Sequence, residues 1–133
     1  MFATEILIAA PPEAVWQAIT TKALVDLYYL APLVADVTGV GQAMTYGSAE
    51  APMIDGLVTA FAPAERLEHG FVFVENGVAG PASEVAYLLT PHGEGTRLTL
   101  EHRGYAPDSQ PYADISMGWP IILDGLKSVA ESQ

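Results

Sequence analysis

The chain has 133 residues, enough for one domain with a substantial core and too few for two ordinary domains, so we expect a single domain over residues 1–133. Sixteen acidic residues against five basic ones give a net charge of −11, which argues against nucleic acid and anionic membranes as partners. The absence of cysteine excludes disulfides, thiolate nucleophiles and cysteine-bound zinc. No apolar run approaches the roughly 20 residues that span a bilayer, and the N-terminus lacks the basic start of a signal peptide. We therefore expect a soluble, cytoplasmic protein.

The first part of the chain predicts one strand and two short helices. FATEILI alternates apolar and polar positions, and the prolines that follow end the strand near Ala9. Pro12 and Glu13 suit a helix start, and Val15, Trp16 and Ile19 form its apolar stripe. TTKALVDLYYL repeats a helical spacing with Leu24, Leu27 and Tyr28, which predicts a second short helix closed by Pro32.

The middle of the chain predicts an antiparallel meander. Apolar stretches separated by Gly, Pro, Asn and Asp turns are typical of such sheets. The predicted strands are a weak pair around LVADV and QAMTY, followed by IDGLVTAFAP, RLEHGFVFVE, SEVAYLLTP and TRLTLEHR. After them the apolar period changes to three and four residues from Tyr112 to Val129, which predicts a long amphipathic helix. The order indicates an α+β fold, with a curved antiparallel sheet of about six strands wrapped around this helix.

A histidine continues one apolar row of the last strand. In TRLTLEHR, Leu98, Leu100 and His102 share a face because side chains alternate along a strand. The same alternation on neighbouring strands predicts three further inward rows: Val85, Tyr87 and Leu89; Leu67, His69, Phe71 and Phe73; and Leu57, Thr59 and Phe61. The opposite rows carry Glu84, Arg66 and Glu68, which supports this assignment of faces.

Four stretches together resemble the START-like, helix-grip superfamily of ligand-binding proteins and polyketide cyclases. Within it they are most similar to the group named after the activator of the heat-shock-protein 90 ATPase. The stretches are IAAPPEAVWQAITTKALVDLYYL, GLVTAFAPAERLEHGF, EVAYLLTPHGEGTRLTLEHRGY and GWPIILDGLKSVAES. The chain departs from many relatives at Tyr28 and Tyr29, where they carry two tryptophans, and at Pro120. Both changes touch the expected cavity wall, so the resemblance implies the fold and a ligand cavity but no particular ligand.

We therefore predict a small hydrophobic or amphipathic ligand between the sheet and the last helix, with no cofactor and no metal site. The residues predicted to contact it are Tyr28, Tyr29, Phe61, His69, Phe71, Phe73, Tyr87, Leu100, His102, Trp119 and Ile122. A second interpretation is that the aromatic residues fill the core and that both histidines bond to neighbouring groups.

Three further questions stay open at this level. A cyclase-like or dehydratase-like enzyme would use His102 or His69 as general base, with Tyr87 or a water as acid, but no nucleophile–base–orienter set is visible. The family's name suggests a co-chaperone, for which no residue gives specific support. Homodimerisation through an exposed sheet edge or the last helix is compatible with the apolar composition.

Overall fold

The fold is described from a computed structural model covering residues 1–133. It contains three helices and eight strands. The helices are α1 (Pro12–Thr20), α2 (Lys22–Val25) and α3 (Gln110–Glu131). The strands are β1 (Phe2–Ile8), β2 (Tyr46–Gly47), β3 (Pro52–Asp55), β4 (Val58–Ala62), β5 (Arg66–Glu75), β6 (Val78–Ala79), β7 (Ser83–His92) and β8 (Gly95–Arg103).

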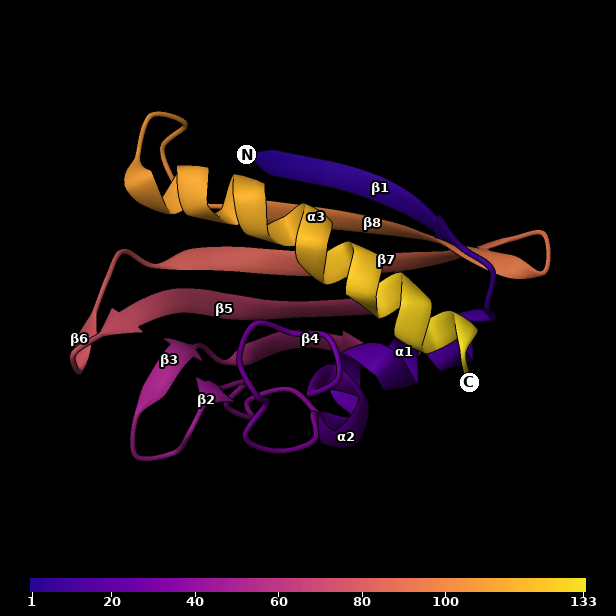
Figure 1. The fold of residues 1–133 in the computed structure, drawn as a ribbon, viewed down its shortest axis with the longest axis horizontal. Helices are drawn as coiled ribbons and strands as arrows, with labels where there is room; N and C mark the ends of the chain where they lie inside the picture. Colours follow the sequence, from indigo (N-terminus) through magenta and orange to yellow (C-terminus); the bar gives the residue numbers. More distant parts are fainter.

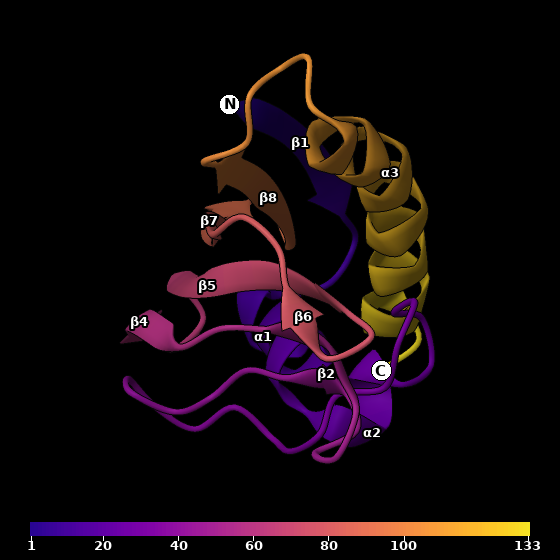
Figure 2. The same ribbon diagram turned by 90° about the vertical axis from the view of Figure 1, so that its left-hand side faces the viewer.

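The strands form one curved antiparallel sheet that α3 crosses diagonally (Figure 1). The order is β1-β8-β7-β5-β3-β2, and β4 and β6 also pair with β5. A view turned by 90° shows α3 along one side of the sheet, with α1 and α2 at one end (Figure 2). The predicted helix-grip architecture is confirmed. No helix is both long and apolar enough to cross a membrane.

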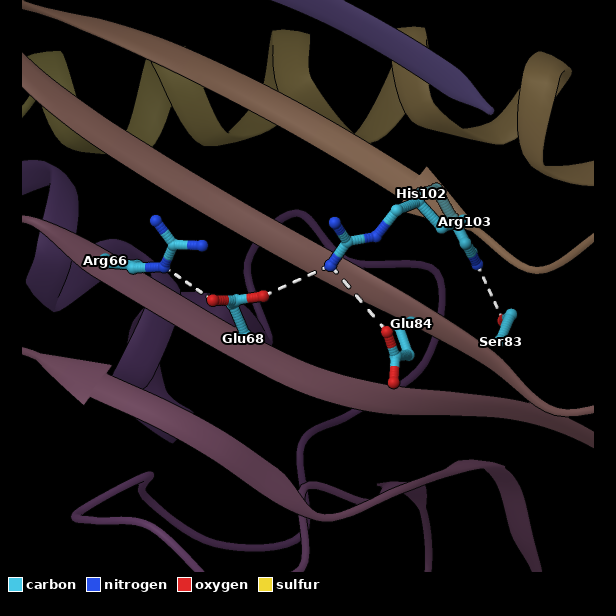
Figure 3. A network of polar contacts seen from close by, with 6 residues as sticks. All are labelled: Arg66, Glu68, Ser83, Glu84, His102 and Arg103. Atoms are coloured by element: carbon cyan, nitrogen blue, oxygen red, sulfur yellow. Dashed lines mark hydrogen bonds and ion pairs between the residues drawn. The ribbon is translucent and has the colours of Figure 1, made fainter.

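The central strands have the predicted faces. β7 and β8 pair so that Val85 lies opposite His102 and Tyr87 opposite Leu100, and all four side chains are buried. On the other face of the sheet, Arg103 contacts the carboxylates of Glu68 and Glu84 (Figure 3). The inward row that contains His102 is therefore confirmed.

One predicted inward row is wrong in part. The stretch IDGLVTAFAP forms two strands, β3 and β4, and a register shift lies between Val58 and Ala60. Val58 is therefore buried at 1% exposure, whereas Leu57 is 57% exposed and Thr59 also faces solvent. Phe61 faces inward as predicted, with its ring edge on Trp16 at 5.2 Å. A bulge of this kind reverses the alternation on which the prediction depended.

The break between β3 and β4 lies where two glycines let the backbones meet. A Cβ atom at Gly56 would lie 1.9 Å from the carbonyl oxygen of Gly70 in β5. Any other residue at this position would force the backbones apart. Between the predicted segments LVADV and QAMTY only one isolated bridge forms, Leu33 with Tyr46. The second segment instead ends in β2, which begins at Tyr46 and pairs with β3, and Ala43 forms a bridge with Leu57.

The second helix is shorter than predicted. It ends at Val25, and Leu27 is 68% exposed. The Asp26 carboxylate accepts from the Leu33 backbone N–H at 2.9 Å and turns the chain back. After this turn Tyr28 and Tyr29 are both partly buried and pack against the core.

Candidate functional site

The inner face of the sheet brings the predicted polar residues together under α3. His69 on β5, Tyr87 on β7 and His102 on β8 are all buried. The His69 and Tyr87 rings stack at 6.1 Å, and the Trp119 ring meets Tyr87 edge-on at 6.0 Å. The side chains that were predicted to share the inner face therefore lie in one region. Their hydrogen bonds determine whether each of them can act as an acid or a base.

His102 is the centre of a chain of hydrogen bonds. The Trp119 Nε1–H donates to His102 Nδ1 at 3.0 Å. His102 Nε2 lies 2.8 Å from Ser83 Oγ, and this serine donates to the Phe71 carbonyl oxygen at 2.6 Å (Figure 3 shows His102 and Ser83). An indole N–H can only donate, so Nδ1 is the acceptor and Nε2 carries the proton.

This tautomer removes His102 from the list of candidate bases. Its one lone pair accepts from Trp119, and its one N–H donates to Ser83. Burial, with a smaller contribution from His69, lowers the pKa of His102 to about 4, so the ring is neutral near pH 7. The Ser83–His102 pair cannot act as a nucleophile and base, because the histidine already holds its proton toward the serine. His102 instead ties α3 to three strands.

His69 has a different environment. Its Nδ1 donates to the Gly70 carbonyl oxygen at 2.7 Å, while Nε2 is buried and has no hydrogen-bond partner. Burial lowers the pKa of His69 to about 4, against the opposing effect of the Gly70 hydrogen bond. The ring is therefore also neutral near pH 7, with one unused acceptor inside the fold.

Four tyrosines surround this interior. Tyr29 stacks on Tyr46 with ring centroids 4.1 Å apart, and the Tyr28 hydroxyl donates to the Ala18 carbonyl oxygen at 2.7 Å. Burial raises the pKa of all four phenols, so Tyr28, Tyr29, Tyr46 and Tyr87 stay protonated at neutral pH. They provide neutral hydroxyl groups and aromatic surface to the interior.

A small cavity of about 50 Å³ lies between α3, the β3–β5 end of the sheet and the loop after α2. Eight of its ten lining residues are hydrophobic. The lining consists of Tyr29, Leu30, Ile54, Phe71, Phe73, Asp114, Ile115, Gly118, Trp119 and Ile122. Five of the eleven residues predicted as ligand contacts line this cavity, namely Tyr29, Phe71, Phe73, Trp119 and Ile122.

The other six predicted contacts, Tyr28, Phe61, His69, Tyr87, Leu100 and His102, do not line this cavity. The space predicted around Tyr87, Leu100 and His102 is filled by packed side chains, because the Trp119 indole bonds directly to His102 across it. The cavity lies beside this contact, on the other side of Trp119 and Phe71.

Several side chains of this region were not predicted from the sequence. Ser83 precedes Val85 and Tyr87 on the inward row of β7, so extending the alternation by one step would have found it. Asp114 and Gly118 are four residues apart on α3, so helical spacing would have placed them on one face of the helix. Ile54 lies on β3, whose limits depend on the Gly56–Gly70 approach, and the sequence pattern gave no sign of its position.

Nothing in this region has the composition of a metal centre, since no group of three or more His, Cys, Asp or Glu side chains is placed to hold an ion. The charged network in Figure 3 lies on the solvent face of the sheet, where Arg66 and Arg103 flank Glu68 at 2.5 and 3.3 Å. Such exposed pairs contribute little to stability and do not reach the cavity.

Comparisons with known proteins agree with this architecture. A family model described as Activator of Hsp90 ATPase homolog 1-like protein matches residues 9–131. A crystal structure of a Mesorhizobium loti protein is 26% identical, with 99% of this chain and 97% of that chain covered and a TM-score of 0.83. DynU16, a putative protein in the dynemicin biosynthetic locus, is 24% identical over 97% of this chain and 46% of its own, with a TM-score of 0.80.

The solution structure of the Aha1 dimer from Colwellia psychrerythraea is 21% identical, with 98% and 95% of the two chains covered and a TM-score of 0.73. Identities of 24% and 21% establish likeness of fold alone. No curated protein matches the sequence.

Proposed function

Because the chain belongs to the Activator of Hsp90 ATPase homolog 1-like family, and α3 encloses an apolar cavity against its sheet, we propose that it binds a small apolar or amphipathic molecule there. The family assignment confirms the resemblance predicted from sequence. The observation that carries the proposal is the cavity itself, with eight hydrophobic residues among ten. Apolar lining with few polar groups is the usual composition of a ligand site.

The size of the cavity limits what it can hold. Its volume of about 50 Å³ is far below the roughly 300–1,000 Å³ of pockets for drug-sized ligands. It suits a short alkyl group or the apolar end of a larger molecule. Leu30 at its edge is 61% exposed, so this side chain can turn outward without losing much buried contact.

An enzymatic role has weaker support. Both ring nitrogens of His102 are hydrogen-bonded within the protein, and His69 and Tyr87 lie behind the cavity wall. DynU16 lies in a biosynthetic locus, but at 24% identity its likeness concerns the fold. Homodimer formation stays a prediction for this chain, and the Colwellia Aha1 structure is of a dimer.

A cavity-filling substitution tests the binding proposal. Gly118 lines the cavity, and a Cβ atom there would meet Leu30 Cδ1 at an ordinary 3.8 Å. Gly118→Leu therefore fills the space without a backbone clash, and loss of glycine from a helix interior also favours folding by about 0.5–1 kcal/mol. Ala113→Leu is the matched control, because Ala113 is exposed on the same helix and outside the lining.

The measurement is a titration with 1-pentanol, followed by the NMR signals of the backbone amide at position 118 and of the Trp119 indole N–H. We expect saturable shifts in the wild type and in Ala113→Leu, and none in Gly118→Leu, although Gly118→Leu should be no less stable to unfolding than the wild type. Absence of saturation in the wild type, or unchanged binding in Gly118→Leu, would overturn the proposal.

A further inference from the structure

The cavity and the groove outside it carry acidic charge alone. Asp114 is the one charged residue of the cavity lining. A groove of about 560 Å³ adjoins the cavity and shares Leu30, Phe73 and Asp114 with it, and its charged residues are Glu75 and Asp114. A ligand that reaches the cavity from this side therefore passes two carboxylates and no basic group.

The chain has no basic side chain free to neutralise these carboxylates. It contains five Lys and Arg residues, and each lies within 4.0 Å of an acid elsewhere. The pairs are Lys22 with Asp26, Arg66 with Glu68, Arg97 with Glu5, Arg103 with Glu68 and Glu84, and Lys127 with Glu131. Asp114 and Glu75 take part in no ion pair, so the mouth of the cavity keeps its negative charge.

Asp114 is also held in position. The Gln110 side chain, one turn earlier on α3, donates from Nε2 to Asp114 Oδ1 at 2.8 Å. This bond uses one carboxylate oxygen and fixes the group beside the cavity, so Oδ2 is available to a ligand. Four aromatic side chains line the space behind it, namely Tyr29, Phe71, Phe73 and Trp119. Aromatic ring faces attract cations and repel anions.

We infer that the ligand is a small amine, whose apolar end occupies the cavity while its ammonium group lies at the mouth against Asp114 and Glu75. This inference rests on the proposed binding function and names its ligand class. An apolar carboxylate or phosphate of the same size would meet uncompensated repulsion at the mouth. The net charge of −11 adds long-range attraction for cations.

Three compounds with the same tail separate charge from apolar binding. We would titrate n-pentylammonium, 1-pentanol and pentanoate at low salt, with the Trp119 indole N–H as the signal. Pentylammonium should bind about fivefold more tightly than pentanol, the factor expected of one solvent-exposed ion pair, and pentanoate more weakly than both. Added salt should reduce the preference.

Two charge variants locate the effect. Asp114→Asn should abolish most of the preference for pentylammonium, measured as the ratio of the pentanol and pentylammonium dissociation constants of the same variant. Glu94→Gln changes the net charge by the same amount at the exposed β7–β8 turn, far along the sequence from the cavity lining, and should keep the preference.

The outcomes are distinct for the two proposals. If pentanol binds but pentylammonium binds no more tightly, the amine inference fails and the binding function stands. If Glu94→Gln loses the preference as Asp114→Asn does, the overall charge and not the cavity mouth is responsible, and the inference also fails. If none of the three compounds binds, both proposals fail.

Discussion

His102 and His69 lie on the same inner face of one sheet and are both neutral, yet they do different things. Both nitrogens of His102 have partners, and the ring joins α3 to the sheet through Trp119 and Ser83. His69 has one partner in its own backbone neighbour, and its second nitrogen has none. Burial alone therefore does not tell whether a polar side chain stabilises the fold. Its effect on stability depends on whether hydrogen bonds within the protein replace those it made to water.

The largest expected effect is loss of stability in mild acid. Both histidines have a pKa near 4 when folded and near the ordinary 6.5 when unfolded. Between these values the unfolded chain takes up protons that the folded chain does not, so stability is complete above pH 6.5 and falls as the pH is lowered toward 4. Each histidine contributes a loss of roughly 3 kcal/mol over this range. Urea unfolding at several pH values measures the slope.

Two controls separate this effect from other groups. His92 is exposed at the end of β7, so His92→Gln is a control that replaces a histidine and leaves both buried histidines in place. The pKa values of the Asp26 and Glu131 carboxyl groups are lowered, mainly by hydrogen bonds from Lys22 and Lys127. Their contribution to stability is therefore lost only as the pH falls below the ordinary pKa values of 3.8 and 4.5. A flat stability between pH 6.5 and 4.5 would contradict the assigned neutral histidines.

The next largest effect is expected for His102→Leu. This change leaves the buried Trp119 indole N–H without an acceptor and removes a bond from Ser83. We expect a loss of roughly 2–3 kcal/mol in the free energy of unfolding. Denaturant unfolding at pH 7.5 measures it, and a loss no greater than that of His69→Leu would refute the difference between the two residues.

A smaller effect is expected for Ser83→Ala. The substitution leaves the His102 Nε2–H buried without an acceptor, at a cost of roughly 1–2 kcal/mol. Ser116→Ala is a suitable control, since the Ser116 hydroxyl donates within its own helix to the Tyr112 carbonyl. The Nε2–H proton resonance of His102 should be protected from exchange in the wild type and lost in Ser83→Ala.

The smallest effect is expected for His69→Leu. The ring loses its bond to the Gly70 carbonyl, but a buried acceptor without a partner is removed at the same time. The stability should stay within about 1 kcal/mol of the wild type at pH 7.5, and the acid-dependent slope should fall by about half. A loss as large as that of His102→Leu would mean that His69 Nε2 has a partner.

The patterns in the chain were sufficient for most of the fold. Alternation predicted the strand β1 and the inward rows of β5, β7 and β8, and the period of three and four residues predicted α3, because side-chain direction in these elements follows from backbone geometry alone. The predictions failed where contacts between distant segments changed the backbone. Such failures were the bulge in β4, the break at Gly56 and the early end of α2.

The sequence by itself determined the helix-grip fold, the family and the inward rows of β5, β7 and β8. Only the tertiary structure decided where space remains among them. The Trp119–His102 bond closes the centre of the fold, while Asp114, Gly118 and Leu30 border a cavity to one side. The physical reason is that direction along a strand or helix is a local property, whereas packing and hydrogen-bond partners depend on segments that meet only in the folded chain.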